Sequence, residues 1–263
     1  MSDGTHEPMP GVTKRRAAPA SLAPASLAPA SLAPASLAPA FLADALRIAR
    51  KDLRIEFRTR SAFLAATVFA VLAVVIFRFT WDPTAIPAFD LAPGVLWVIF
   101  TFSGLLGLNR SFGLELSDRA YDGLLASQVS RESIFVGKVL ANLAFVGGVQ
   151  ALALPAVALF FDLHVGSAWG VLIGIVLCAS LGLAAVGTLF AAIASNTRLA
   201  ELLLPMMTLP FFVPLVIPAA QTSAVILRGQ PLEDAMPWFK LLLAFDLVFV
   251  TACIVVFPYT IEE

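Results

Sequence analysis

The chain has 263 residues, of which 59% are apolar and 13% are charged, with a formal net charge of −1 and a mean hydropathy of +0.90. Soluble domains carry roughly 25% charged residues, so this composition excludes a single soluble core and predicts an integral membrane protein. Two histidines, two cysteines and no Cys-x-x-Cys pair leave no basis for a His₂ or Cys/His metal site. The sequence also contains no Gly-x-x-x-x-Gly-Lys-Ser/Thr and no Gly-x-Gly-x-x-Gly motif, so any ATP or dinucleotide must be bound by another chain.

Residues 1–40 are predicted to form a disordered cytoplasmic tail. The unit Ala-Ser-Leu-Ala-Pro occurs four times without change from Ala20 to Pro39. A proline at every fifth position disfavours a helix, and the segment has no apolar run long enough for a signal peptide. We therefore expect two parts, the tail at 1–40 and a membrane domain at 41–263.

The membrane domain is expected to begin with an amphipathic helix near Phe41. Apolar residues recur on one helical face from Leu42 to Phe57, and five Lys and Arg residues occupy the rest of the circumference between Arg47 and Arg58. A basic amphipathic helix that leads directly into a span is typical of the cytoplasmic membrane interface.

Six apolar segments follow, each long enough to cross about 30 Å of hydrocarbon. We place the spans at about 62–80, 91–108, 139–161, 169–195, 202–227 and 238–257, and expect Ser130 to cap the helix that becomes the third. The predicted fold is an all-α integral membrane protein with six transmembrane helices after an interfacial helix.

The basic residues predict the orientation. With the N-terminus inside, 14 of the 17 Lys and Arg residues fall in inner segments, and only Arg78, Arg228 and Lys240 lie toward the outer side. By the positive-inside rule, both termini are expected to be cytoplasmic.

The inner segment at 110–138 holds eight charged residues and is the longest connection between predicted spans. Glu115 and Arg119 are four apart in the favourable order, and Asp118 and Asp122 share a neighbouring face. Clustered charge below the membrane favours a docking helix for another protein, with Arg131 at its far end, although a solvated connecting loop would also carry charge.

The fifth span contains four prolines, at positions 205, 210, 214 and 218. Each proline removes a backbone donor and clashes with the preceding turn, so the sequence predicts a broken helix here. Broken backbone in a membrane is tolerated only against protein or a water-lined cavity. Pro205, Pro210 and Pro214 are therefore candidates for a moving or pathway-lining element, although proline kinks also serve packing.

Asp246 lies eight residues into the sixth span. A charged carboxylate there costs about 2.5–3.5 kcal/mol, so its side chain should face the bundle or a cavity. Asp246 is therefore a further pathway candidate, although a protonated, structural role fits equally well. Cys178 and Cys253 are expected to be packed thiols. His164 is the one histidine placed to ligate a metal or haem iron, but it falls in a short outer loop where a plain surface role is the commoner one.

Five segments of the chain resemble those of a known family: Arg47–Arg60, Asn109–Glu115, Asp122–Leu125, Gly137–Asn142 and Glu201–Pro214. These segments are similar to the CcmB family, the permease subunit of the haem exporter of cytochrome c maturation, which has the ABC-2-type permease architecture. They occur in order and with similar spacings over about Leu46 to Tyr259.

The resemblance implies a non-catalytic permease subunit of a bacterial inner-membrane ABC transporter. Two copies would pair with two cytoplasmic ATP-binding subunits, which would receive the segment at 110–138. ATP would be bound by these partner subunits. A haem-handling membrane subunit and a periplasmic haem chaperone would complete the assembly, and no nucleic acid is expected. Haem would be the handled substrate, held mainly on a partner, and ATP hydrolysis would power either haem export or release of the haem-loaded chaperone.

Two other hypotheses fit the residues. One keeps the ATP-driven permease and changes its substrate to a lipid, polysaccharide or drug, because the amphipathic helix and inner segment would look alike. The other is a membrane scaffold that transports nothing and needs no ATPase partner.

Overall fold

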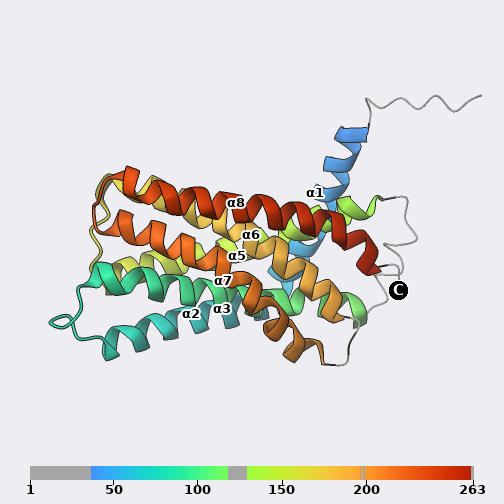
Figure 1. Ribbon diagram of the computed structural model, residues 1–263. Helices are drawn as coiled ribbons and strands as arrows, with labels where there is room; N and C mark the ends of the chain where they lie inside the picture. Colours follow the sequence, from blue (N-terminus) through green and yellow to red (C-terminus); the bar gives the residue numbers. More distant parts are fainter. Residues whose placement is uncertain (1–36, 118–128, 196, 198, 262–263) are drawn as a thin grey trace, which may run out of the picture. The chain divides into compact units, whose positions relative to one another are not determined.

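The computed structural model describes residues 37–117, 129–195, 197 and 199–261, and every regular element in these ranges is a helix (Figure 1). The long helices are α1 (Leu37–Thr59), α2 (Ser61–Thr80), α3 (Ala88–Ser117), α5 (Arg131–Phe160), α6 (Trp169–Ser195), α7 (Ala200–Leu227) and α8 (Leu232–Val256). Two short 3₁₀ helices, η1 (Gly166–Ala168) and η2 (Phe257–Ile261), precede α6 and follow α8. The all-α prediction is confirmed.

Six of these helices are long and apolar enough to cross a membrane, which confirms the predicted number of spans. Several extend past the predicted apolar segments. Helix α5 begins at Arg131, eight residues before the predicted third span, because Ser130 caps it: the Ser130 hydroxyl accepts the Ser133 N–H at 3.2 Å.

The amphipathic helix begins earlier than expected. Helix α1 starts at Leu37, so the last predicted residues of the tail, 37–40, belong to the helix. Pro39 is compatible with this start because the first four N–H groups of a helix have no intrahelical partner. The rest of the predicted tail lies outside the described residues.

Helices α3 and α6 form the centre of the bundle. In their membrane-spanning segments, 72% of the residues of α3 and 61% of those of α6 are buried, whereas the share is 22% in α2 and in α8. Helix α3 packs on α5, α6 and α7 and brings the large side chains of Trp97 and Phe100 into the core. The exposed apolar residues of α2 and α8 therefore form faces suited to lipid or to another membrane protein.

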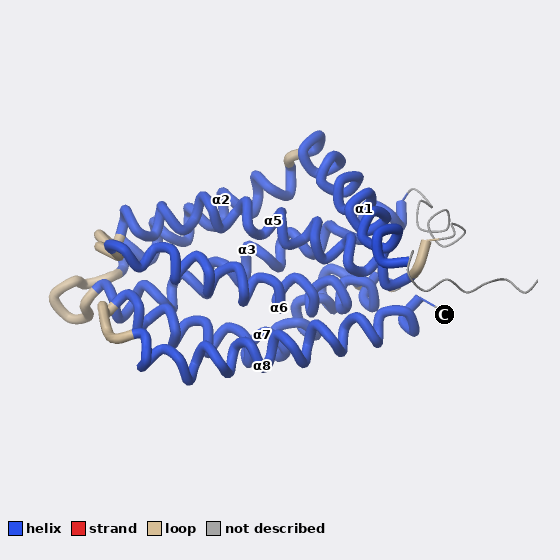
Figure 2. Tube along the Cα trace, turned by 90° about the horizontal axis from the view of Figure 1, so that it is seen from above, coloured by secondary structure: helices blue, strands red, loops and turns tan. Residues whose placement is uncertain are grey.

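The helix ends gather at two ends of the bundle (Figures 1 and 2). We name the two ends after the predicted orientation: the outer end has the connections at 81–87, 161–168 and 228–231, and the inner end has α1, the start of α5 and η2. At the inner end, the Phe135 and Phe257 rings lie 4.9 Å apart and the Ser133 hydroxyl donates to the Phe41 carbonyl at 3.4 Å. The first helix of the membrane domain and its last described residues thus lie at the same end of the bundle.

Candidate functional site

Of the five residues predicted to dock another protein, one has a described side chain. Arg131, the first residue of α5, is half-buried and donates from Nη1 to the Pro258 carbonyl at 3.3 Å, which ties the start of α5 to the C-terminal end. Helix α3 continues through Glu115 to Ser117, well past the apolar window that ends at Leu108. Asp118, Arg119 and Asp122 lie outside the described residues, as does the side chain of Glu115, so docking stays a prediction.

Helix α1 is clamped onto α5 by an ion pair that the sequence did not indicate. The Lys138 side chain is fully buried, and its Nζ lies 3.5 Å from Asp52 Oδ2, while Lys51 Nζ lies 3.1 Å from Asp52 Oδ1. Beside this pair, Gly137 leaves room for α1, because a Cβ there would lie 2.7 Å from the Ala45 carbonyl oxygen. An acidic residue in the middle of a basic helix, Asp52, was the feature of the sequence that could have suggested an ion pair here.

Asp246 faces the bundle, as predicted, and joins α8 to α6. Its carboxylate Oδ2 accepts a hydrogen bond from the Cys178 thiol at 2.9 Å, and the residue is 5% exposed. Its other oxygen, Oδ1, is buried, lies against Gly182 of α6, and has no hydrogen-bond partner among the described residues. A Cβ at Gly182 would overlap this oxygen and lie 3.0 Å from Leu215 of α7. Cys178 is therefore more than a packed thiol, since it donates to the buried acid.

Three further buried hydrogen bonds join helices across the membrane domain. They are Asn142 Nδ2 to Thr188 Oγ1 at 2.8 Å, Ser180 Oγ to Gln150 Oε1 at 2.9 Å, and Trp97 Nε1 to Ser223 Oγ at 3.0 Å. Side-chain hydrogen bonds of this kind hold transmembrane helices together where the hydrophobic effect cannot. They fix the packing of α5 on α6 and of α3 on α7.

The predicted break in the fifth span is not present. Helix α7 is continuous from Ala200 to Leu227 through all four prolines. A proline in a membrane helix costs a donor but leaves the rest of the hydrogen-bond ladder intact, and neighbouring helices support the local distortion. Pro205 and Pro214 are half-buried, whereas Pro210 lies on the exposed side of the helix. A pathway-lining role for these prolines stays a prediction.

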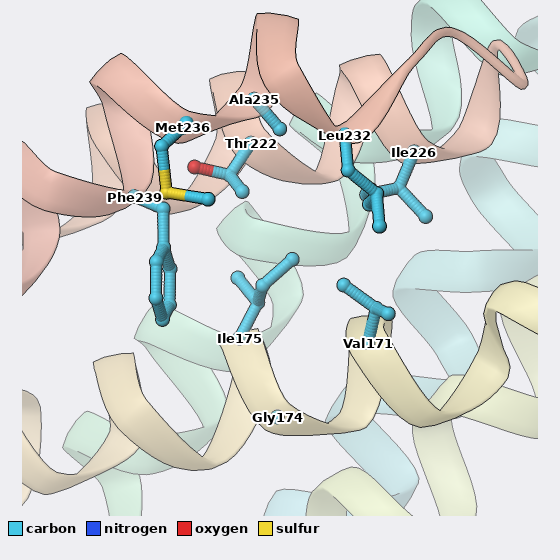
Figure 3. Close-up of a pocket in the computed structure, with 9 residues that line it drawn as sticks. All are labelled: Val171, Gly174, Ile175, Thr222, Ile226, Leu232, Ala235, Met236 and Phe239. Atoms are coloured by element: carbon cyan, nitrogen blue, oxygen red, sulfur yellow. The ribbon is translucent and has the colours of Figure 1, made fainter.

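An apolar cavity of about 310 Å³ opens between α6, α7 and α8 near the outer end (Figure 3). Val171 and Ile175 of α6 face Leu232 and Met236 of α8 across it. The hydroxyl of Thr222, which also lines the cavity, donates to the Pro218 carbonyl at 2.7 Å, so this polar group is already satisfied.

A second cavity, of about 600 Å³, adjoins the first and shares three of its lining residues, Val171, Ile226 and Leu232. His164 and Arg228 are among the residues that line this second cavity. Arg228 Nε donates to Asp90 Oδ1 at 2.7 Å, and the His164 side chain is 85% exposed. No group of three or more His, Cys, Asp or Glu side chains that could hold a metal ion occurs in the described ranges.

The outer connection between α2 and α3 is ordered by its own hydrogen bonds. The hydroxyl and the N–H of Thr84 donate to Asp82 Oδ1 at 2.7 and 2.9 Å, and these bonds hold the pKa of the Asp82 carboxyl below its usual value. Trp81 donates from Nε1 to the Ile86 carbonyl at 2.9 Å and lies under the Arg78 guanidinium. This aromatic residue ends α2 at a predicted membrane boundary.

The model of the family described as CcmB protein matches residues 43–262 of this chain. The chain belongs to the CcmB family. It is 30% identical to heme exporter protein B of Paracoccus denitrificans over 75% of this chain and 88% of that protein. For heme exporter protein B of Rhodobacter capsulatus, identity is 28% over 70% of this chain and 84% of the relative, and for that of Haemophilus influenzae it is 26% over 65% and 77%.

The CcmB match includes the main features of the candidate site. The clamp between Asp52 and Lys138, the Cys178–Asp246 pair, the prolines of α7 and both outer cavities all lie between residues 43 and 262. The four repeats between Ala20 and Pro39 lie outside the part of the chain that is matched.

Proposed function

We propose that this chain is the transmembrane permease subunit of an ABC transporter for haem export or haem-chaperone release in c-type cytochrome biogenesis. The observation that carries the proposal is the family match over residues 43–262, together with relatives named heme exporter protein B that align over most of their length. Six membrane-spanning helices and the absence of an ATP-binding motif in the sequence support a non-catalytic membrane subunit.

In this proposal, ATP is hydrolysed by a separate cytoplasmic subunit. That subunit would dock on the charged inner segment through Glu115, Asp118, Arg119, Asp122 and Arg131, and a second copy of this chain would complete the transporter. The chain would act with a haem-handling membrane subunit and a periplasmic haem chaperone in the bacterial inner membrane. Cytoplasmic termini are supported by the inner Lys and Arg excess and by the shared side of α1 and the C-terminus.

The decisive experiment is a deletion strain whose membranes are examined by haem staining of denaturing gels, with b-type haem spectra as the internal control. We expect covalent haem bands to be lost while b-type signals persist, and the cloned gene to restore the bands. Unchanged c-type bands in a strain without a second maturation system would refute the haem assignment and favour an ABC-2-type permease for a lipid, polysaccharide or drug.

A further inference from the structure

The junction between α1 and α2 is a sharp elbow at one residue, Arg60 (Figure 2). Arg60 has a left-handed backbone, with φ of 56°, and its guanidinium Nε donates to the Phe57 carbonyl at 3.1 Å. Glu56 of α1 accepts the N–H of Phe63 at 3.1 Å, which satisfies one free donor of the first turn of α2. Hydrogen bonds to the end of α1 and to the first turn of α2 therefore stabilise the elbow.

The inside of this elbow holds a cavity of about 470 Å³ with α5 as its third wall. This size falls within the range of small-molecule sites, roughly 300–1,000 Å³. Most of the lining is apolar, from Leu53 and Phe57 of α1, Phe63 and Leu64 of α2, and Phe145 of α5. Gly148 of α5 also lines the cavity, and its missing side chain keeps the space open beside the Phe63 ring.

Basic side chains outnumber acidic ones in and beside the cavity. Arg60 lines it, and Arg54 and Arg58 lie on the adjoining surface of α1, exposed and without an ion pair among the described residues. Glu56 is the one acidic lining residue, and its carboxylate already accepts the Phe63 N–H at the positive end of α2. A largely apolar cavity is thus lined by one arginine and lies beside two further exposed arginines.

We propose that this elbow cavity binds one anionic phospholipid, with an acyl chain inside and the phosphate against Arg60. A basic amphipathic helix places the elbow at the level of the lipid head groups, and the cytoplasmic leaflet is the one that carries anionic lipid. Arginine is suited to phosphate because its planar donors bind two oxygens at once. The lipid would fill the wedge between α1, α2 and α5 and hold α1 at a fixed angle to the membrane. This inference concerns lipid binding and does not depend on the cargo of the transporter.

Native mass spectrometry of the purified full-length chain in mixed micelles would test the proposal, with phosphatidylglycerol and phosphatidylcholine as probes. We expect one phosphatidylglycerol to stay bound at collision energies that remove phosphatidylcholine. Arg60→Asn should weaken this retention about fivefold, as expected for one cation beside an anionic head group. Asparagine tolerates the left-handed backbone, so this variant removes the charge without straining the elbow.

Three matched variants make the result specific. Arg60→Lys keeps the charge and should retain most of the lipid, and Arg50→Gln removes an arginine of the same helix that does not line the cavity and should retain all of it. Ala144→Trp fills the cavity from α5 and should abolish retention. Equal retention of the two lipids, or loss of phosphatidylglycerol in Arg50→Gln but not in Arg60→Asn, would overturn the proposal. Loss of the bound phosphatidylglycerol from the dimer but not from the monomer in the same spectra would also overturn it, because a second copy of the chain would then occupy the cavity.

Discussion

Gly182 is the residue of α6 that lets the Asp246 carboxylate approach the helix backbone. We expect Gly182→Ala to lower the stability of the protein by about 1–3 kcal/mol, because the added methyl group would overlap Asp246 Oδ1 and crowd Leu215. Thermal unfolding of the purified protein in detergent measures the effect.

Gly174 is the matched control for this prediction, since it lies two turns earlier in α6 and a Cβ there would meet no atom within 4 Å. Gly174→Ala should leave stability unchanged or raise it slightly, because alanine is the better helix former. Adding Asp246→Ala to Gly182→Ala should recover part of the loss. If Gly182→Ala unfolds at the same temperature as Gly174→Ala, the close approach of Asp246 to α6 is wrong.

The sequence indicates that Asp246 is unusual in its span, but it does not indicate which residues of other helices it contacts. An acid in an apolar span has to face the bundle because of its cost in lipid, and Asp246 does so. Its partner Cys178 lies 68 positions away, and that pairing depends on how α6 and α8 rotate against each other. Gly182 leaves room for the approach, because a Cβ there would overlap the Asp246 carboxylate, but a single glycine in an apolar span does not indicate which residue it will face.

At the scale of elements, the clamp between α1 and α5 makes the amphipathic helix part of the membrane domain. We expect Asp52→Ala to destabilise the protein by several kcal/mol, roughly 3–5, because it removes a carboxylate partner of the fully buried Lys138 ammonium. Asp44→Ala removes the half-buried partner of the exposed Arg47 side chain on the same helix and should cost less than about 1 kcal/mol. Equal unfolding temperatures for the two variants would contradict the clamp.

The prolines of α7 offer a second test at this scale. Pro210→Ala restores a backbone donor in an exposed part of the helix and should raise stability by up to about 3 kcal/mol. If α7 bends during transport, the same variant should reduce covalent haem bands. Pro237→Ala of α8, also exposed and inside a helix, is the control and should leave the bands unchanged. Full activity of Pro210→Ala would argue against a moving role for this proline.

The elements themselves could be predicted because apolar length and periodicity are local properties. All six spans occur where the apolar segments indicated, and the Ser130 cap forms as expected. The errors came from the rule that proline breaks a helix. Four prolines do not interrupt α7, and α1 begins at Leu37 in spite of Pro39. In each case the missing donor costs less than the rule assumed, because helix ends and neighbouring helices compensate.

At the scale of the whole molecule, the two ends of the bundle differ in charge and in construction. The outer end has short connections, an ion pair between Arg228 and Asp90, and two adjoining cavities. The inner end carries the basic helix α1, and the charged segment at 110–138 is predicted from the sequence to lie on the same side. A cytoplasmic ATPase would meet the inner end, so a change of charge there should act differently from the same change at the outer end.

Reversing charge at Asp118 and Asp122 tests this asymmetry. We expect Asp118→Lys with Asp122→Lys to uncouple the chain from its ATPase, because like charges across a protein interface repel and slow association. The readouts are covalent haem bands and recovery of the ATPase subunit with the purified chain. Glu233→Lys with Asp234→Lys makes the same change in the exposed first turn of α8 at the outer end, and both readouts should stay near normal. Normal cytochrome c maturation by a stably inserted Asp118/Asp122 variant would mean that these carboxylates do not form the docking surface.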